Sequence, residues 1–523
     1  MQERQATIRG IGVGVRGSVP ALPVVFLAAA PLAAVLAGAA SLMAAPPAAG
    51  AEADGPRLIE AVRAEDTESV VALLDRGADA RTAQPDGATA LHWASYRDAV
   101  DLADLLLAAG GDVDAANDYG ITPLALACEN GSAPMVRRLL AAGADPNAAR
   151  ATGETPLMTC ARTGSLDAVQ ALLASAADPN AAESWRGQTA LMWAAGEGHT
   201  PVARALVAHG ADVRARSAAG FTPLLIAARE DRPALARLLL DAGAEVNAPA
   251  PDGLTPLLVA TLRGHSALAI TLLERGADPN AGAAGYTALH WASGSWHTEL
   301  TGSLRGIATE RDEEWQSLNG VGVGRLVLVE ALLEHGADPD ARLAAHPPQF
   351  GFASQRFRVS LAGATPFLLA AMDGNLAVMR ALAAAGADLH LPTEQGTTPL
   401  MLASGLGRVP AETRVTEGES LEAVGFLLER GAEINAANGD GRTALHGAAH
   451  VRSDALVQLL VDHGAEVRAG DRRGITPLMI AEGGGHILLP GLGGGSTADL
   501  LRALGGGEGG ADLIGRFDEG PIR

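Results

Sequence analysis

The chain has 523 residues, more than one ordinary hydrophobic core accommodates, so several domains or an array of repeats is expected. Its 60 acidic and 39 basic side chains give a formal charge of −21, which repels phosphate backbones and argues against a nucleic-acid partner. Two cysteines are too few for a disulfide-rich scaffold or a structural zinc cluster. The abundance of alanine and the 64 glycines are typical of a GC-rich bacterial genome.

The N-terminal segment differs from the rest of the chain. Arginines precede an apolar run over residues 19–45, and small residues follow before the first acidic position. This order predicts a signal peptide over residues 1–51 and an exported, periplasmic or extracellular protein. An uncleaved anchor in the inner membrane over residues 19–45 is the alternative, because about 20 apolar residues span a bilayer. The three prolines within the run favour cleavage.

From residue 55 onward the chain repeats a pattern, mostly at intervals of 32 to 34 residues. The heptapeptide TALHWAS occurs at residues 89–95 and again at residues 287–293. Its core, Gly-x-Thr-Pro/Ala-Leu, recurs with threonines at Thr89, Thr122, Thr155, Thr189, Thr222, Thr255, Thr287, Thr365, Thr398, Thr443 and Thr476. A Gly-Ala-Asp/Glu signal typically follows each threonine after 21 residues, and a degenerate unit over residues 57–79 precedes them. The pattern predicts about twelve stacked units.

Each unit is expected to form two short helices. In one unit Thr122 caps the first helix, and Pro123 occupies the first position, where a missing N–H is harmless. A second helix is predicted over residues 133–142, and Gly143 ends it in the left-handed conformation. A helix pair of this size cannot bury its apolar faces alone, so each unit depends on its neighbours.

The motifs resemble those of the ankyrin-repeat family. Thr89-Ala-Leu-His92 and Thr155-Pro-Leu-Met158 are similar to its Thr-Pro-Leu-His signature, and Gly276-Ala-Asp-Pro-Asn280 is similar to Gly-Ala-Asp-Val-Asn. The resemblance covers residues 55–505 and implies an all-α solenoid with β-hairpin finger loops. It also implies binding through a concave groove, without catalysis or a cofactor. Residues 506–523 are expected to form a flexible tail.

Three units keep the family's histidine, at His92, His290 and His446. The resemblance implies a structural hydrogen-bonding role that links neighbouring turns. A metal-binding role is disfavoured, because no second set of ligands accompanies these histidines, and no metal site is predicted.

Tryptophan and cysteine mark two further positions of the repeat. Trp93, Trp193 and Trp291 occupy one equivalent position, where packing between the two helices is favoured over ligand contact. Cys128 and Cys160 lie in successive units, and small buried thiols are the favoured interpretation. A disulfide is possible only if their α-carbons come within about 7 Å of each other.

Insertions interrupt the repeat near residues 294–322, 343–361, 405–418 and 483–495. Five of the 17 aromatic residues lie in the first two insertions, and two arginines alternate with the aromatic residues of the second. Aromatic and arginine side chains dominate binding hot spots, so these residues form the leading candidate recognition site. They are Trp296, Trp315, Phe350, Phe352, Arg356, Phe357 and Arg358. The alternative, given equal weight, is that the aromatic residues only anchor the insertions against the stack.

Other candidate binding residues come from the regular units. Residues just after each first helix are expected to face the groove, and they include Tyr96, Arg97, Glu129, Arg162, Glu197, Arg229, Glu230 and Arg263. Tyr119 and Trp185 are expected at finger tips.

The predicted function is a non-enzymatic interaction scaffold for a protein or peptide partner. The alternative is an enzyme whose active site lies within residues 296–358. That alternative requires the acidic residues of the first insertion to converge on His297 or His346, and those residues are Glu310, Asp312, Glu313 and Glu314.

Overall fold

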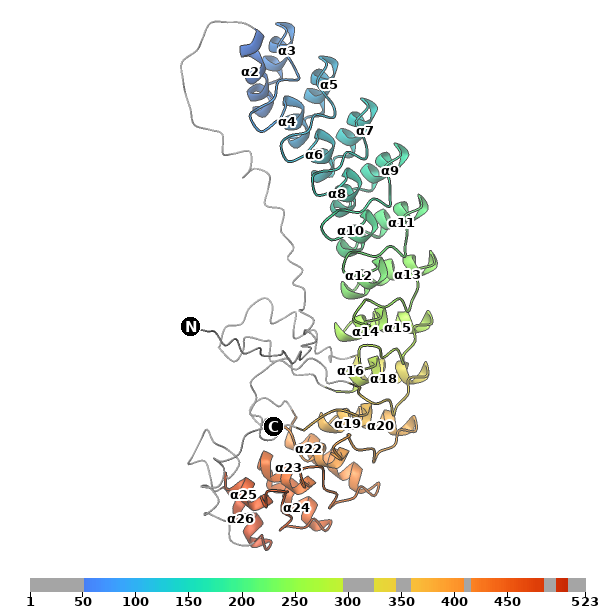
Figure 1. Cartoon of the computed structure of the whole chain (residues 1–523), viewed down its shortest axis with the longest axis vertical. Coiled ribbons are helices and arrows are strands. Elements are labelled where there is room, and N and C mark those ends of the chain that lie inside the picture. The colour runs from blue at the N-terminus through green and yellow to red at the C-terminus, as the bar shows by residue number, and fades with distance from the viewer. Residues whose placement is uncertain (1–50, 295–323, 345–358, 409–414, 484–494, 507–523) are drawn as a thin grey trace, which may run out of the picture. The chain divides into compact units, whose positions relative to one another are not determined.

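The computed structural model describes residues 51–294, 324–344, 359–408, 415–483 and 495–506, which belong to one unit of the chain, Ala51–Arg523 (Figure 1). Regular structure in these ranges is α-helical. The β-type pairing found there is limited to two isolated antiparallel bridges, Ala83–Thr89 and Ala182–Thr189, so the expected finger hairpins appear as turns rather than as strands.

The helices come in consecutive pairs, each with a first and a second helix. The first helices are α2 (Ala51–Arg63), α4 (Ala90–Tyr96), α6 (Pro123–Glu129), α8 (Pro156–Thr163), α10 (Ala190–Glu197), α12 (Pro223–Arg229), α14 (Pro256–Leu262), α16 (Ala288–Ser293), α19 (Pro366–Met372), α21 (Pro399–Ala403), α23 (Ala444–Val451) and α25 (Pro477–Ala481). The second helices are α3 (Thr67–Asp75), α5 (Val100–Ala108), α7 (Ala133–Ala141), α9 (Leu166–Ala174), α11 (Thr200–Ala208), α13 (Pro233–Asp241), α15 (Ser266–Glu274), α18 (Arg325–Glu334), α20 (Leu376–Ala384), α22 (Glu417–Leu428), α24 (Asp454–Asp462) and α26 (Ser496–Ala503).

Within this unit the helices form two adjacent rows (Figure 1). Each first helix packs against the first helices of the preceding and following pairs, and the second helices do the same in their own row. The rows continue across the insertions, because α16 contacts both α18 and α19, and α21 contacts both α22 and α23. The two rows and the turns between successive pairs define the fold.

A threonine stands at the N-cap of each first helix from α4 onward, and in several of them its side chain accepts a capping hydrogen bond. Thr122 is extended, with φ −102° and ψ 162°, and its side chain accepts a hydrogen bond from the Ala125 N–H at 3.2 Å. Pro123 follows at the first helical position, as predicted. The second helix of this unit, α7, ends one residue earlier than predicted, and Gly143 adopts φ +95° after it.

Burial is unequal between the two rows. In α6 all residues from Pro123 to Cys128 are buried, because this helix lies between neighbouring first helices and its own second helix. In α7 one face remains exposed and the other buries Met135, Val136 and Leu139. The first helices therefore form the centre of the stack.

A row of asparagines ties the turns together along the stack. The Asn180 side chain donates from Nδ2 to the Gly210 carbonyl at 2.9 Å and accepts at Oδ1 from the Asp212 N–H at 2.7 Å. The same paired bonds are made by Asn147, Asn247, Asn280 and Asn435. Each such residue satisfies backbone groups of the next unit, which the solvent-exposed turn would otherwise leave to water.

The three family histidines make the predicted links between neighbouring turns. The Thr89 N–H donates to Nδ1 of His92 at 3.1 Å, so the ring proton is on Nε2, which donates to the Ile121 carbonyl at 2.9 Å. His290 bonds Thr287 and the Ala341 and Ala364 carbonyls in the same manner.

Burial holds these imidazoles neutral. It lowers the pKa of His92 and His446 below 6.5, and it lowers the pKa of His290 from 6.5 to about 4. The hydrogen bonds to carbonyl oxygens act in the opposite direction but are weaker than the effect of burial.

These pKa values predict a loss of stability in mild acid. Between about pH 6.5 and 4 the unfolded chain binds a proton at His290 and the folded chain does not. The free energy of unfolding therefore decreases as the pH is lowered from 6.5 to 4. A shift of this size corresponds to roughly 3 kcal/mol for His290, fully present above pH 6.5 and lost by about pH 4. Urea unfolding of the wild type and of His290→Gln at pH 7.5, 6, 5 and 4 measures it, since both proteins share all other titrating groups. Equal pH dependence in the two proteins would contradict the assignment.

Candidate functional site

The first helices and the turns carry the side chains that change from unit to unit. The residues four and seven positions after the capping threonine lie one turn apart on the same side of each first helix. At the fourth position stand Trp93, Leu126, Thr159, Trp193, Ile226, Val259, Trp291, Leu369, Leu402, Gly447 and Ile480. At the seventh stand Tyr96, Glu129, Arg162, Gly196, Arg229, Leu262, Gly294, Met372, Gly405, His450 and Gly483. The fourth position is buried in every unit except at Trp193, whereas the seventh position is partly exposed in most units. We call this side of the first helices, together with the adjoining turns, the first-helix face.

Arginines stack on aromatic rings in the part of this face formed by α8, α10 and α12. The Arg162 guanidinium carbon lies 5.5 Å from the centre of the Trp193 ring. In the next unit Arg229 lies 5.7 Å from the Phe221 ring. Such contacts hold a positive group over an aromatic surface without neutralising it.

The turn before α10 presents an exposed tryptophan on a fixed backbone. The buried Glu183 carboxylate accepts hydrogen bonds from the backbone N–H groups of Trp185 at 2.6 Å, Arg186 at 2.8 Å and Gln188 at 3.1 Å. Trp185 is 69 % exposed, and the Arg186 guanidinium lies 4.4 Å from its ring centre. A large aromatic side chain on an ordered turn loses little further conformational entropy on binding.

Tyr119 occupies the turn before α6 in a comparable way. Asn117 Oδ1 accepts from the N–H groups of Tyr119 at 3.0 Å and Ile121 at 2.9 Å, and the Tyr119 side chain is 56 % exposed. The structure therefore places both predicted finger-tip aromatics in exposed turns.

The remaining predicted groove residues lie at the ends of the first helices. Five of them belong to the last turns rather than following the helices, and they are Tyr96, Glu129, Arg162, Glu197 and Arg229. Arg97, Glu230 and Arg263 are the C-cap residues that follow α4, α12 and α14, as expected.

The insertion residues Trp296, Trp315, Phe350, Phe352, Arg356, Phe357 and Arg358 lie outside the described residues, as do Glu310, Asp312, Glu313, Glu314, His297 and His346. The described flanks of the second insertion are buried. Leu343 and Leu361 are 1 % and 4 % exposed and pack in one cluster with Trp291, and the Leu343 N–H donates to the Ala364 carbonyl at 2.9 Å. The insertion therefore leaves and rejoins the stack through apolar anchors.

The tryptophans of the repeat are only partly as predicted. Trp93 and Trp291 are buried, but their contacts lie towards the turns and the adjacent first helices. Trp93 Nε1 donates to Gln84 Oε1 at 3.1 Å, and the Arg63 guanidinium of α2 lies 4.5 Å from its ring centre. Their position faces the turns because it lies on the same side of the helix as the capping threonine.

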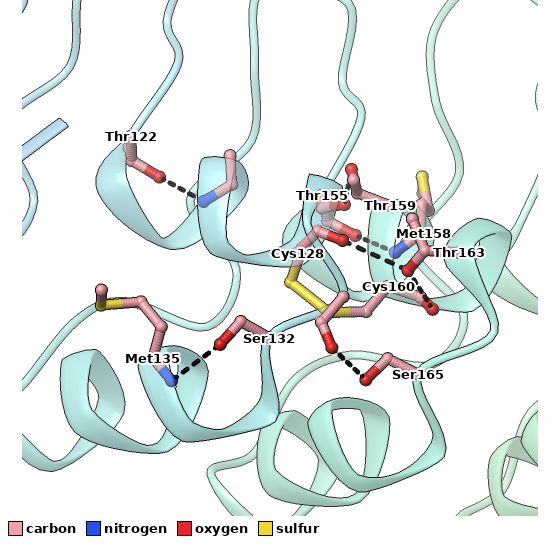
Figure 2. The surroundings of a disulfide bond; sticks show 12 residues. Thr122, Cys128, Ser132, Met135, Thr155, Met158, Thr159, Cys160, Thr163 and Ser165 are labelled. Carbon is pink, nitrogen blue, oxygen red and sulfur yellow. Dashed lines mark hydrogen bonds between the residues drawn. A yellow bond between two sulfur atoms is a disulfide. The ribbon is translucent and has the colours of Figure 1, made fainter. Parts of the chain in front are cut away.

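A disulfide joins two neighbouring first helices beneath this face (Figure 2). Cys128 of α6 and Cys160 of α8 have no exposed surface, and their α-carbons are 4.6 Å apart. Burial was predicted correctly, but the favoured interpretation as free thiols is wrong. The two cysteines occupy the sixth and the fifth position after their threonines, and this offset brings the sulfur atoms together across adjacent helices.

The loops beside the disulfide are also linked between units. Thr163 Oγ1 donates to the Cys128 carbonyl at 3.2 Å, and Ser165 Oγ donates to the Gly131 carbonyl at 2.7 Å (Figure 2). These bonds continue the contact between the second and third threonine-capped units from the helices into the loops that connect them.

The part of the chain that the structure describes contains no group of three or more His, Cys, Asp or Glu side chains arranged to hold a metal ion. Nor does any helix of the described ranges combine the length and apolar character needed to cross a bilayer.

Comparison with known proteins agrees with this geometry. The family model for ankyrin repeats (three copies) matches overlapping segments across residues 58–304 and again residues 414–489, more than half of the chain. The chain therefore belongs to the ankyrin-repeat family.

Curated relatives match over part of their lengths. Ankyrin repeat domain-containing protein 63 of Homo sapiens is 36 % identical over 120 residues, which are 23 % of this chain and 26 % of the relative. The probable 26S proteasome regulatory subunit p28 of Saccharomyces cerevisiae is 35 % identical over 127 residues, which are 24 % of this chain and 50 % of that protein. Potassium channel AKT3 of Oryza sativa subsp. japonica is 36 % identical over 84 residues, 16 % of this chain and 9 % of the channel. The chain thus spans half or less of the length of these eukaryotic relatives.

The disulfide predicts a stability that depends on reducing agent. It closes a loop of sequence separation 32, for which chain entropy gives about 3–4 kcal/mol of stabilisation. We expect a reductant to lower the urea midpoint of the wild type to that of the double variant Cys128→Ala, Cys160→Ala, whose own midpoint does not respond. Alanine is a suitable replacement because Ala127 and Ala161 occupy the neighbouring equivalents of these positions. Two titratable thiols in denatured, unreduced protein would show that the bond is absent.

Proposed function

We propose that this protein is a non-enzymatic scaffold that binds a protein or peptide through the first-helix face and its turns. In this proposal the helix pairs are twelve ankyrin units, and the turns act as the fingers of the family. The main support is that the residues two and five positions after each threonine are buried and are nearly always leucine and alanine, while the seventh position, partly exposed in most units, and the turns vary. Variation at accessible positions is what a recognition surface on a repeat array requires.

Trp185 and Tyr119 are the strongest individual candidates for contact with the partner. Both are large and exposed, and each stands on a turn whose backbone is held by a side chain of the same turn. Interface hot spots are enriched in tryptophan, tyrosine and arginine. The aromatic residues of the insertions are proposed to extend the same surface, since the flanks of the second insertion join the stack beside Trp291.

Export is part of the proposal. A buried disulfide between two units is the chemistry of an oxidising compartment, and the residue order at the N-terminus is that of a signal peptide. The composition supports a bacterial source, with the periplasm or the exterior of the cell as the site of action.

Substitution at the exposed turn tests this function. Envelope extracts are passed over the immobilised wild type, Trp185→Ala and Val327→Ala. Val327 is the matched control, because it is 54 % exposed but lies on the second helix α18. A hot-spot tryptophan contributes about 2 kcal/mol, so we expect the affinity for the captured partner to fall roughly thirtyfold in Trp185→Ala. We expect it to be unchanged in Val327→Ala.

The contribution of the second insertion is tested in the same experiment. Because Leu343 and Leu361 are buried, the deletion covers residues 346–357 and leaves both anchors in place. Weaker capture supports a binding role for the insertion. If the deletion variant and Trp185→Ala both capture as much partner as the wild type does, binding through the insertion and through the exposed turn is contradicted.

A further inference from the structure

In α10 the seventh position of the first-helix face is a glycine, Gly196, and so carries no side chain. The seventh positions of the flanking units carry Arg162 in α8 and Arg229 in α12, and α10 packs between these two helices. Gly196 is inside a helix, where glycine is less stable than alanine. It therefore calls for a packing or a binding explanation.

Packing does not explain this glycine. A Cβ atom built at Gly196 meets only Ile226 Cγ2, at 3.9 Å, which is an ordinary van der Waals contact. Other glycines of the same two rows are different, since a Cβ at Gly405 would lie 2.5 Å from Val451 and one at Gly447 would lie 2.6 Å from the Leu406 nitrogen. Those glycines let another part of the chain approach, whereas Gly196 leaves a notch that the described protein does not fill.

Two hydrogen-bond donors on α10 and on its neighbour α8 have no acceptor. Arg162 Nε and Trp193 Nε1 are both buried without a hydrogen-bond partner in the structure. At the equivalent position Trp93 Nε1 is satisfied by Gln84. A buried donor without an acceptor is unfavourable by about 1–3 kcal/mol, so this pair is better satisfied when an acceptor enters from outside.

The charges beside the notch favour an anionic group. Arg229 is paired with Glu230 at 2.7 Å, and Arg150 with Glu129 and Glu154. Arg162 makes no ion pair with any described residue, although the whole chain carries a formal charge of −21. The residue that follows Gly196 in the sequence is acidic, Glu197.

We propose that the notch at Gly196 receives a carboxylate side chain of an acidic segment of the partner. The carboxylate oxygens accept from Arg162 after a rotation of its flexible side chain, and the stem of the incoming residue packs on the Trp193 ring. Arg186, stacked on the exposed Trp185 of the preceding turn, extends the positive surface for a second acidic residue. This inference rests on the proposed scaffold function and assigns the chemistry of its partner.

The glycine gives an unusual signature for a test. Gly196→Ala removes the helix penalty without a clash, so its thermal unfolding midpoint should rise while its binding weakens. Gly196→Leu places a larger side chain in the notch. The control pair is Gly425→Ala and Gly425→Leu. Gly425 is likewise inside a helix with no atom within 4 Å of a built Cβ, but it lies on the second helix α22.

The probe is an array of random twelve-residue peptides, bound by the full-length protein. We expect the peptides bound by the wild type to be enriched in Asp and Glu, and their affinity to fall at least tenfold in Gly196→Leu and in Arg162→Gln. Affinity is expected to be unchanged in Gly425→Leu and raised several-fold in Glu197→Gln, which removes the negative charge of the residue that follows Gly196.

Three outcomes would overturn the proposal. They are bound peptides without acidic enrichment, equal affinity in wild type and Gly196→Leu, or binding only by phosphoserine versions of the same peptides. If Trp185→Ala weakens capture of a partner while Gly196→Leu does not, the scaffold function stands and the carboxylate notch is wrong. If neither substitution affects capture, both are wrong.

Discussion

The structure depends on contact between neighbouring units, because no helix pair here is large enough to bury its own apolar surface. The first helix α6 buries all but its last residue, and it does so only because α4 and α8 lie on either side of it. The polar groups follow the same rule. His92 reaches the carbonyl of Ile121 in the next turn, and Asn180 satisfies both a donor and an acceptor of the following unit. The interface between units is therefore the element on which stability rests.

This constraint also decides where the sequence is free to change. Positions buried against a neighbouring unit are mostly leucine, alanine and the capping threonine, while the seventh positions of the first helices are partly exposed in most units. Tyrosine, arginine and glutamate occur at these seventh positions, and Tyr119 and Trp185 are exposed in the turns. Gly196 is the sharpest case, because the helix would be more stable with alanine and no packed atom prevents it. A residue that lowers stability without a packing reason points to recognition.

The insertions are tolerated for the same physical reason. They enter at loops, so the rows of helices continue across them, as the contact of α16 with α19 shows. Buried side chains pack or form hydrogen bonds where the insertions join the stack. Leu343 and Leu361 close the gap beside Trp291, and the buried Arg408 donates to the Met372 and Ala403 carbonyls and to Ser420 where the third insertion begins. Burial lowers the pKa of Arg408 to about 10, yet it stays charged at neutral pH.

The sequence alone determined the period, the family, the helix starts at threonine and the histidine links, because each follows from neighbours along the chain and from strict repetition. It also identified Trp185 and Tyr119 as turn residues. It did not determine the disulfide, the direction in which Trp93 and Trp291 face, or the empty place above Gly196. These depend on which side chains meet across adjacent helices. A one-position offset between Cys128 and Cys160 brings two sulfur atoms together. Whether a glycine leaves an open space or allows close packing depends on the residues of the neighbouring helix that face it. Only the tertiary structure decides such matters, since helices packed side by side bring together residues from different units.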